Sequence, residues 1–386
     1  MIAGTAATRP IVIAVDSFKG TISATDASAA FREGWRSERP DDDVRLLPMA
    51  DGGEGTIDAF AAAVPGAIRR SLMVTGPEDE PIQTTWLHLP PDDESPQGTA
   101  IVELASASGI ELLGRPPRLR PLDAHTVGFG EAIRAALAAG VSRLVLGIGS
   151  SASTDGGVGM LAALGARFSG DDATAIPRGG RGLGRLASVD LRSLPDLPPG
   201  GVVVLTDVTI PLLGTDGAAS VFGPQKGAGP RDVAQLERGL ERLASLVPID
   251  PLTPGAGAAG GTGFGLLAWG AQLVGGAASV GELIGLPEAV RGSALVVTGE
   301  GSFDGQSAAG KAPSHVADLA RRAGVPVALV AGRIAPEAEV CRFAASVSLT
   351  DLGGAPSALA EPARWLTEAG RVLARRAPTF LGRRSS

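Results

Sequence analysis

The sequence predicts an α/β protein of two domains. One is a Rossmann-like, doubly wound parallel sheet, and the other is a second α/β domain with mixed or antiparallel strands. The chain has 386 residues, more than one hydrophobic core usually supports. Towards both ends, short apolar runs alternate with amphipathic stretches of helical spacing, as in a doubly wound sheet. The segment between them contains alternating, helix-poor sequence bounded by turn residues.

The N-terminal part reads as two strand, loop and helix units. The β-branched run from Ile11 to Val15 predicts a strand, and the alanine-rich stretch from Ser23 to Trp35 predicts a helix. A second strand ends near Leu47, and the acidic loop DGGE leads from it into a helix that begins near Gly55. Both loops carry carboxylates at strand ends, which is where ligands bind in open α/β sheets.

The middle of the chain predicts hairpins followed by further α/β units. Residues 68–104 contain SLMVTG, IQTTWLHL and TAIVEL, separated by PEDEP and PPDDESPQG, and this pattern is typical of antiparallel strands. A helix from Val127 to Ala139 and a strand in RLVLGIGS follow. The segment SASTDGG then leads into a helix that we expect to begin near Gly156.

The next elements are a buried strand from Val202 to Leu205, which ends in Asp207, and an amphipathic helix from Arg231 to Val247. Residues 255–261 match G-x-G-x-x-G, but they follow PIDPLTP instead of a strand. A dinucleotide site needs the preceding strand, so we interpret this segment as a flexible loop lined by backbone.

The C-terminal part alternates strand and helix again, through ALVVTG, PSHVADLARRAG, VPVALVAG, ASVSLT and EPARWLTEAGRVLARRA. We therefore expect residues 1–75 and 290–386 to form one discontinuous Rossmann-like domain. Residues 76–289 would then be an inserted domain, with the active site in the cleft between the two.

Composition excludes several classes of function. A net charge of −7 without a basic patch argues against nucleic acid, and no apolar run approaches the ~18 residues of a membrane span. The start MIAGTAATRP lacks signal-peptide features, and a single cysteine agrees with a reducing compartment. We expect a cytoplasmic protein with small-molecule partners, and a homodimer is left open.

Lysine is rare, because only three of the 34 basic residues are lysine. Lys19 lies in SFKGT, Lys226 in GPQKGA and Lys311 in AAGKAP, each beside a glycine. A compact ammonium beside closely approaching backbone suits phosphate or carboxylate oxygens.

The segment TGEGSFDGQSAAGKAP resembles a phosphate loop only in part. The spacing G-x-x-x-x-G-K ends at Lys311, but Ala312 stands where a Ser or Thr would bind magnesium. We expect the strand to end at Thr298, so that Glu300 and Asp304 form an acidic metal loop coupled to the lysine.

Phosphoryl transfer needs a metal, cations on the phosphates and a carboxylate that accepts the hydroxyl proton. The three lysines supply the cations. We predict that they converge with the strand-end carboxylates on one bound nucleotide. These carboxylates are Asp16, Asp51, Glu54, Asp155, Asp207, Glu300 and Asp304.

The motifs DSFKGTISA, LPMADGGEGT, GIGSSASTDGGVGMLAALGARF, VFGPQKGAG, GAGAAGGTGFG and TGEGSFDGQSAAGKAP, in this order, resemble the bacterial type I glycerate kinases. This resemblance runs from about residue 11 to about residue 335. It implies ATP- and Mg²⁺-dependent phosphorylation of D-glycerate, usually to 2-phosphoglycerate, in a two-domain α/β enzyme.

Roles follow from the resemblance and the residues together. We expect Asp207 to be the general base, with Asp16 and Asp155 as competitors. The other expected sites are magnesium at Asp51, Glu300 and Asp304; the β- and γ-phosphates of ATP at Lys19 and Lys311; further nucleotide contacts at Gly52, Gly53, Lys226 and Gly310; and glycerate at Ser150, Ser151, Ser153 and Asp155.

Two other classes of function stay open. A nicotinamide-dependent oxidoreductase would use the glycine-rich segments, although the acidic residue expected ~20 positions after its fingerprint is missing. A non-catalytic sensor of small acids would keep the fold and the pocket without turnover. The position of the phosphate in the product, 2 or 3, is also open.

Overall fold

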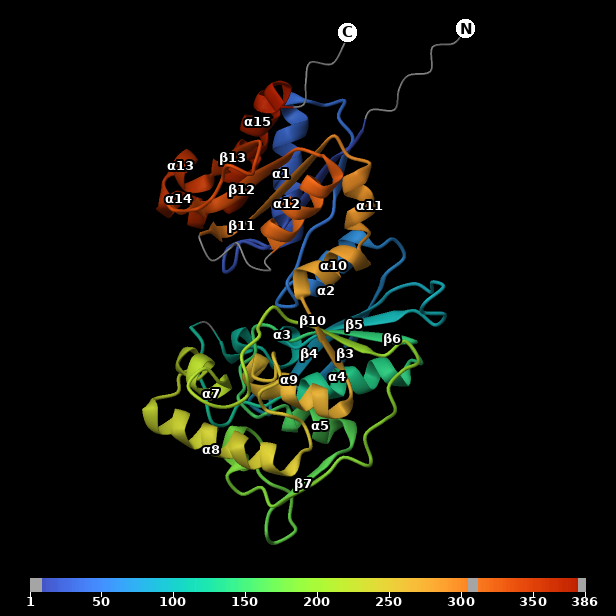
Figure 1. The fold of residues 1–386 in the computed structure, drawn as a ribbon, viewed down its shortest axis with the longest axis vertical. Helices are drawn as coiled ribbons and strands as arrows, with labels where there is room; N and C mark the ends of the chain where they lie inside the picture. The colour runs from blue at the N-terminus through green and yellow to red at the C-terminus, as the bar shows by residue number, and fades with distance from the viewer. Residues whose placement is uncertain (1–8, 115, 305–311, 381–386) are drawn as a thin grey trace. The chain divides into compact units, whose positions relative to one another are not determined.

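The computed structural model describes residues 9–114, 116–304 and 312–380 (Figure 1). The chain divides into two compact units, each described here by itself. Unit 1 comprises residues 1–51, 58–65 and 277–386, and unit 2 comprises residues 52–57 and 66–276. Within the described residues, no helix combines the length and the apolar character that a membrane span requires.

Unit 1 is built on a five-stranded parallel sheet of order β13-β12-β11-β1-β2. Its strands are β1 (Ile11–Val15), β2 (Val44–Leu46), β11 (Leu295–Phe303), β12 (Val327–Ile334) and β13 (Ala345–Ser348). The associated helices are α1 (Ala24–Glu38), α2 (Thr56–Ala63), α10 (Gly276–Leu283), α11 (Leu286–Arg291), α12 (Ala312–Ala323), α13 (Leu349–Gly353), α14 (Ala355–Ala360) and α15 (Pro362–Phe380).

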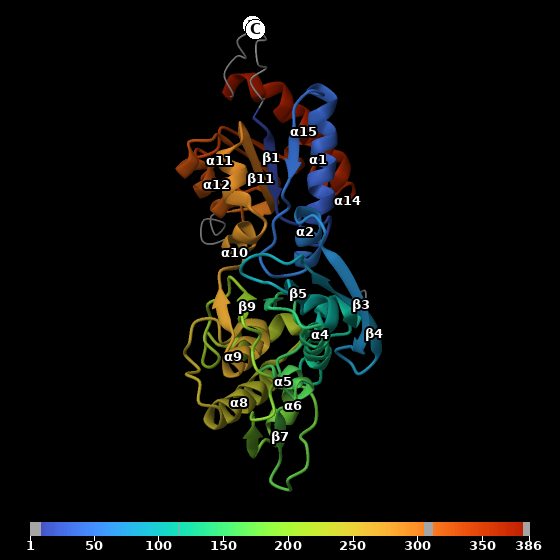
Figure 2. The ribbon, with the colours of Figure 1, turned by 90° about the vertical axis from the view of Figure 1, so that its right-hand side faces the viewer.

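Helices cover both faces of this sheet, with α1 and α15 on one face and α11 and α12 on the other (Figure 2). Every residue of β1 is buried, as its uninterrupted apolar sequence predicts for a central parallel strand. Helix α1 begins after Ser23, whose hydroxyl accepts the N–H of Asp26, and it buries Phe31 and Trp35 against the sheet. The doubly wound parallel sheet predicted from the sequence is therefore confirmed.

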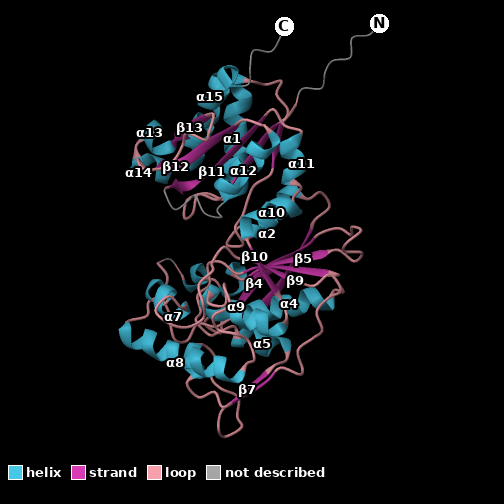
Figure 3. Ribbon diagram, viewed as in Figure 1, coloured by secondary structure: helices cyan, strands magenta, loops and turns pink. Residues whose placement is uncertain are grey.

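Unit 2 contains a six-stranded mixed sheet of order β10-β9-β6-β5-β4-β3 (Figure 3). Strands β3, β4 and β5 pair antiparallel, and the others pair parallel. They are β3 (Ile68–Thr75), β4 (Pro81–His88), β5 (Thr99–Glu103), β6 (Arg143–Gly147), β9 (Val202–Leu205) and β10 (Gln272–Val274), with a separate ribbon of β7 (Arg167–Ser169) and β8 (Ser188–Asp190). The prediction of mixed or antiparallel strands in a second α/β domain is confirmed.

The helical segments of unit 2 are α3 (Ala105–Ser108), α4 (Val127–Ala138), α5 (Val158–Leu164), α6 (Gly180–Leu183), α7 (Ala218–Phe222), α8 (Pro230–Leu246) and α9 (Ala258–Trp269), together with the 3₁₀ turns η1 (Ile110–Leu113) and η2 (Pro224–Lys226). The expected loop at residues 255–261 runs directly into α9. Its last three residues, 259–261, have left-handed backbone, and regular helix follows them.

Two local expectations differ from the structure. β11 continues past Thr298 to Phe303, because its pairing with β12 extends to Phe303 and Ile334. Glu300 therefore lies in a strand instead of a loop. The unit boundaries also differ from the expected limits at 75/76 and 289/290. Strand β3 pairs along its whole length with β4 and so falls in unit 2.

Candidate active site

The carboxyl ends of two central strands bring acidic residues together in unit 1. Asp16 follows β1, and its N–H donates to the carbonyl of Gly299 (2.8 Å), the residue before Glu300 in β11. The chain after β2 runs beside β1, since the N–H of Met49 donates to the carbonyl of Val15 (2.9 Å), and this path carries Asp51 to the same edge. We call Asp16, Asp51 and Glu300 the acidic cluster.

Asp16 is buried, and the pKa of its carboxyl is raised. Only 8% of the residue is exposed, and burial, followed by the negative charges of Asp51 and Glu300, raises the pKa of its carboxyl to about 7. The N–H of Ser17, which donates to Asp16 Oδ1 (2.6 Å), and the charge of Lys19 oppose this rise. Burial and the two neighbouring carboxylates thus both oppose ionisation of Asp16.

Lys19 is the cation of the cluster. Its Nζ donates to Asp51 Oδ2 (2.9 Å), and its side chain is 75% exposed. Burial lowers the pKa of Lys19, but the charge and hydrogen bond of Asp51 outweigh burial and raise it above its ordinary value. A Cβ at Gly301 would lie 3.2 Å from the Cα of Phe18, so glycine lets the Lys19 loop lie close to β11.

A cavity of about 470 Å³ opens beside the cluster, within the size range of small-molecule sites. Asp16, Lys19, Asp51 and Glu300 line it, and Asp304 joins them. Its apolar lining includes Leu349, Ala355, Ala358, Leu359 and Pro362. A lining with both charged and apolar side chains would suit a ligand with a polyanionic part and a flat hydrophobic part.

Arg333 also lines this cavity, and the sequence analysis missed it. It lies near the end of β12 and pairs in register with Ser302 of β11. The rule that ligands bind at carboxyl ends of parallel strands would have indicated it. Arginine is so common in this chain that Arg333 did not stand out by composition.

The carboxylates of the acidic cluster decide whether Mg²⁺ could bind in this cavity. Of the residues that the structure describes, no three His, Cys, Asp or Glu side chains are grouped so that they could hold a metal ion. Magnesium, however, often takes one or two protein carboxylates, and phosphate oxygens and waters complete its shell. Burial and, after it, the charges of Asp51 and Glu300 raise the pKa of Asp16, and a divalent cation would offset both effects. The cluster therefore fits Mg²⁺ bound together with phosphate, and it is not a preformed three-carboxylate cage.

A second pocket, of about 360 Å³, lies wholly within unit 2. Loop residues Ser150 and Ser151, after β6, line it together with Lys226, at the end of η2. Lys226 Nζ donates to Ser151 Oγ (2.8 Å) and to the carbonyl of Ser153. Burial lowers the pKa of Lys226 to about 7, against the opposing charge of Asp155. The structure thus groups Lys226 with the predicted substrate serines, whereas Lys19 belongs to unit 1.

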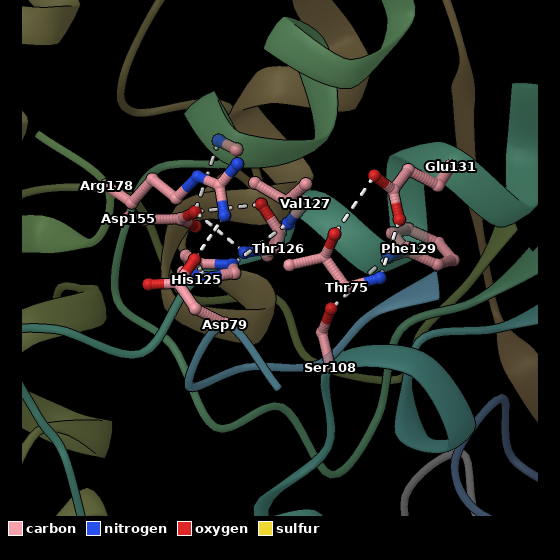
Figure 4. Close-up of polar contacts among 11 residues, drawn as sticks. Thr75, Asp79, Ser108, His125, Thr126, Val127, Phe129, Glu131, Asp155 and Arg178 are labelled. Carbon is pink, nitrogen blue, oxygen red and sulfur yellow. Dashed lines mark hydrogen bonds and ion pairs between the residues drawn. The ribbon is translucent and has the colours of Figure 1, made fainter. Parts of the chain in front are cut away.

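Asp155 holds elements of unit 2 together (Figure 4). Its Oδ2 accepts the N–H (3.0 Å) and the hydroxyl (2.8 Å) of Thr126, at the start of α4. At the start of α5, Asp155 accepts the N–H of Gly157 at Oδ1 and the N–H of Gly159 at Oδ2. Helix α5 begins at Val158, so the serines do not cap it. The N–H groups of Gly157 and Gly159 at this helix end are thus used by Asp155 itself.

The neighbouring loops in Figure 4 are joined by further charges. Nε2 of the buried His125 lies 3.2 Å from Asp79 Oδ1, in the turn between β3 and β4. Arg178 contacts the same oxygen of Asp79. This network fixes the loop before α4, and through Thr126 it supports Asp155.

Asp207 lies after β9 and is exposed, and its Oδ1 accepts the N–H of Gly276 (2.7 Å). Gly52 packs against the end of the same strand, where a Cβ would lie 2.4 Å from the carbonyl oxygen of Leu205. Its φ of +92° also favours glycine. Packing therefore requires glycine at position 52. It also requires glycine at position 149, where a Cβ would meet Gly53 Cα at 2.5 Å. Contact of Gly52 or Gly53 with a nucleotide stays a prediction.

The predicted residues thus form two groups. Unit 1 brings together Asp16, Lys19, Asp51, Glu300 and Asp304, and unit 2 brings together Ser150, Ser151, Ser153 and Lys226. Gly310 and Lys311 lie outside the described residues. Convergence of all three lysines on one nucleotide stays a prediction.

Comparisons with known proteins agree across the chain. Residues 11–377 match the model of the glycerate kinase family. Glycerate 2-kinase of Escherichia coli K12 is 40% identical over 337 residues, which cover 86% of this chain and 87% of the relative. Glycerate kinase of Bacillus subtilis 168 is 41% identical over 331 residues, covering 84% and 85%. The crystal structure assigned as glycerate kinase 2 of Salmonella typhimurium LT2 superposes with a TM-score of 0.82 at 38% identity, covering 96% of this chain and 99% of that one.

Proposed function

The chain belongs to the glycerate kinase family, and we propose that this glycerate kinase transfers the γ-phosphoryl group of ATP to a hydroxyl of D-glycerate, with Mg²⁺ as cofactor. The proposed product is 2-phosphoglycerate. The relative from E. coli, named a glycerate 2-kinase, supports that position. A cytoplasmic location and a homodimer stay predictions.

One observation carries the proposal for the donor site. The acidic cluster and Lys19 line a cavity in unit 1 whose lining also includes apolar side chains. Phosphoryl transfer is catalysed mainly by positioning and by neutralising charge on the phosphates. Lys19 and Arg333 would contact phosphate oxygens, and Leu359 and Pro362 would face the adenine ring.

Magnesium, when bound, would neutralise the charge that develops on the transferred phosphoryl group. Asp51 and Glu300 are the proposed ligands, and Asp304 would orient them or a bound water. Asp16 would be held ionised once a cation offsets the burial and the neighbouring negative charges that raise its pKa.

The acceptor hydroxyl must lose a proton to a base. Asp207 is our proposed base, because it is an exposed carboxylate at the end of β9 whose neighbours Thr206 and Val208 line the unit 2 pocket. The hydrogen bond from Gly276 fixes its side chain. Asp16 is the competitor, because it lines the cavity in unit 1 and would be ionised, and so able to accept a proton, once a cation is bound.

A coupled ADP-release assay with D-glycerate, ATP and Mg²⁺ tests this function. We expect turnover that disappears with EDTA and returns with Mg²⁺, and phosphorus NMR of the product should show 2-phosphoglycerate. Glycerol in place of glycerate is the matched control for the acid group. Absence of glycerate-dependent ADP release would reject the proposed reaction. A 3-phosphoglycerate signal would reject only the proposed position of the phosphate in the product.

A further inference from the structure

We propose that Lys226 and Ser151 bind the carboxylate of the acid substrate, so that unit 2 by itself selects a hydroxy acid. This inference rests on the proposed function. It reassigns Lys226, which the sequence had suggested as a nucleotide contact. The unit 2 pocket of about 360 Å³ is at the small end of ligand sites, which suits a three-carbon acid better than a nucleotide.

The side-chain amine of Lys226 is buried, with 3% of the residue exposed. Within the part of the chain that the structure describes, it has no ion pair with a carboxylate. Its Nζ contacts are the hydroxyl of Ser151 and the carbonyl of Ser153. An ammonium has three N–H donors, so two contacts leave one donor for a ligand. A charge buried without a counterion is costly, which favours the neutral amine, whereas a bound carboxylate would stabilise the ammonium.

Ser151 can act with Lys226 on the same anion. Its Oγ accepts from Nζ at 2.8 Å, which leaves the hydroxyl proton to donate elsewhere. Hydrogen bonds fix the loop after β6 on both sides of Ser151. The N–H of Ile110 donates to the carbonyl of Ser150 (2.9 Å), and the N–H of Ala152 donates to that of Ser108 (3.1 Å). The two donors are thus held in place before any ligand binds.

The charge of the pocket distinguishes a carboxylate from a polyphosphate. Among the described residues that line it, Lys226 is the only charged side chain, and Ser150, Ser151, Thr206 and Gln225 supply neutral polar groups. One ammonium matches one carboxylate, whereas a triphosphate needs several cations or a metal. The neutral polar groups are suited to the hydroxyls of a hydroxy acid.

Isothermal titration of nucleotide-free protein with D-glycerate at pH 8 tests the proposal. Loss of a charge-assisted hydrogen bond should weaken glycerate binding by about 10- to 100-fold in Lys226→Met. Ser151→Ala should weaken it by about 2- to 10-fold. Arg231→Met, which removes an exposed cation of α8 in the same unit, should change it by less than about twofold. Binding of ADP should be unchanged in all three variants.

Proton linkage gives a second readout. Lys226 is largely neutral at pH 8, and Asp155 is the charged group that acts on it. A bound carboxylate would favour the ammonium, so wild-type protein should take up a proton on binding glycerate, seen as a heat that varies with the buffer. Lys226→Met should lack this uptake. Ser151→Ala keeps the buried ammonium, so it tests the same contact if Lys226→Met does not fold.

Unchanged glycerate affinity in Lys226→Met, or an equal loss for glycerate and ADP, would overturn the inference. The proposed kinase function and the proposed role of Lys226 can be refuted independently of each other. If wild-type protein binds glycerate through Lys226 but releases no ADP, the kinase reaction fails and this inference stands. If ADP is released and Lys226→Met keeps the wild-type KM for glycerate, only this inference fails.

Discussion

Replacing Asp16 with Asn should stabilise the magnesium-free protein at pH 8. The pKa of Asp16 rises from 3.8 to about 7, mainly through burial and the charge of Asp51. The folded protein therefore holds a proton that the unfolded chain releases between pH 4 and pH 7. The free energy of unfolding falls as pH rises through this window, because the unfolded chain binds fewer protons.

The size of the effect follows from the same pKa. At about 1.4 kcal/mol for each pH unit, the ionised carboxyl destabilises the folded state by about 4 kcal/mol above pH 7. Asn does not titrate, and its Oδ1 can still accept the N–H of Ser17. We expect the gain from Asp16→Asn to be small near pH 4 and to grow to about 4 kcal/mol at pH 8.

Urea unfolding in EDTA at pH 4.5, 6 and 8 measures this gain. Hydrogen exchange of the β1 amides, Ile11–Val15, measures the stability of unit 1 separately from that of unit 2. Asp43→Asn is the matched control. Asp43 pairs with Arg45 at 3.3 Å with both side chains more than half exposed, so we expect a change within about 0.5 kcal/mol at every pH.

A loss of stability in Asp16→Asn at pH 8, or the same shift at all three pH values, would refute this reasoning. Mg²⁺ and ADP should also raise the free energy of unfolding of Asp16→Asn less than that of the wild-type protein. Wild-type protein should gain stability from Mg²⁺ and ADP at pH 8, and the variant should gain less because one carboxylate of the cluster is lost.

Three further predictions concern unit 2. Burial lowers the pKa of Lys226 from 10.5 to about 7, so the unfolded chain binds more protons between these values and the free energy of unfolding should rise with pH from 7 to 10. Lys226→Met should lack this rise when urea midpoints are compared with those of Arg231→Met. Asp155→Asn should destabilise unit 2 by about 2–4 kcal/mol, measured by hydrogen exchange in α4 and α5, because buried N–H donors lose a carboxylate; a change confined to KM would contradict this. Asp207→Asn should lower kcat by about 10²- to 10⁴-fold if Asp207 is the base, and unchanged turnover would transfer that role to Asp16.

Local sequence predicted much of the fold because the relevant signals are local. The uninterrupted apolar run of β1 and the Ser23 cap of α1 each depend on neighbouring residues, and the structure confirms both elements. The carboxylates Asp16 and Asp51 were found by the same reasoning, because the carboxyl ends of parallel strands lie at one edge of a sheet. That rule required only the position of each strand end.

Contacts between distant segments decided the rest. Glu300 reaches Asp16 because β11 pairs with β1 and continues past its expected end, which depends on β12. Lys226 lies among the serines because η2 packs against the loop after β6, and no local pattern in GPQKGA indicates that partner. The pKa values of Asp16 and Lys226 arise from burial. Burial is a property of the folded chain, so residue type and spacing indicated which side chains carry chemistry, while tertiary packing determined their neighbours and their charge.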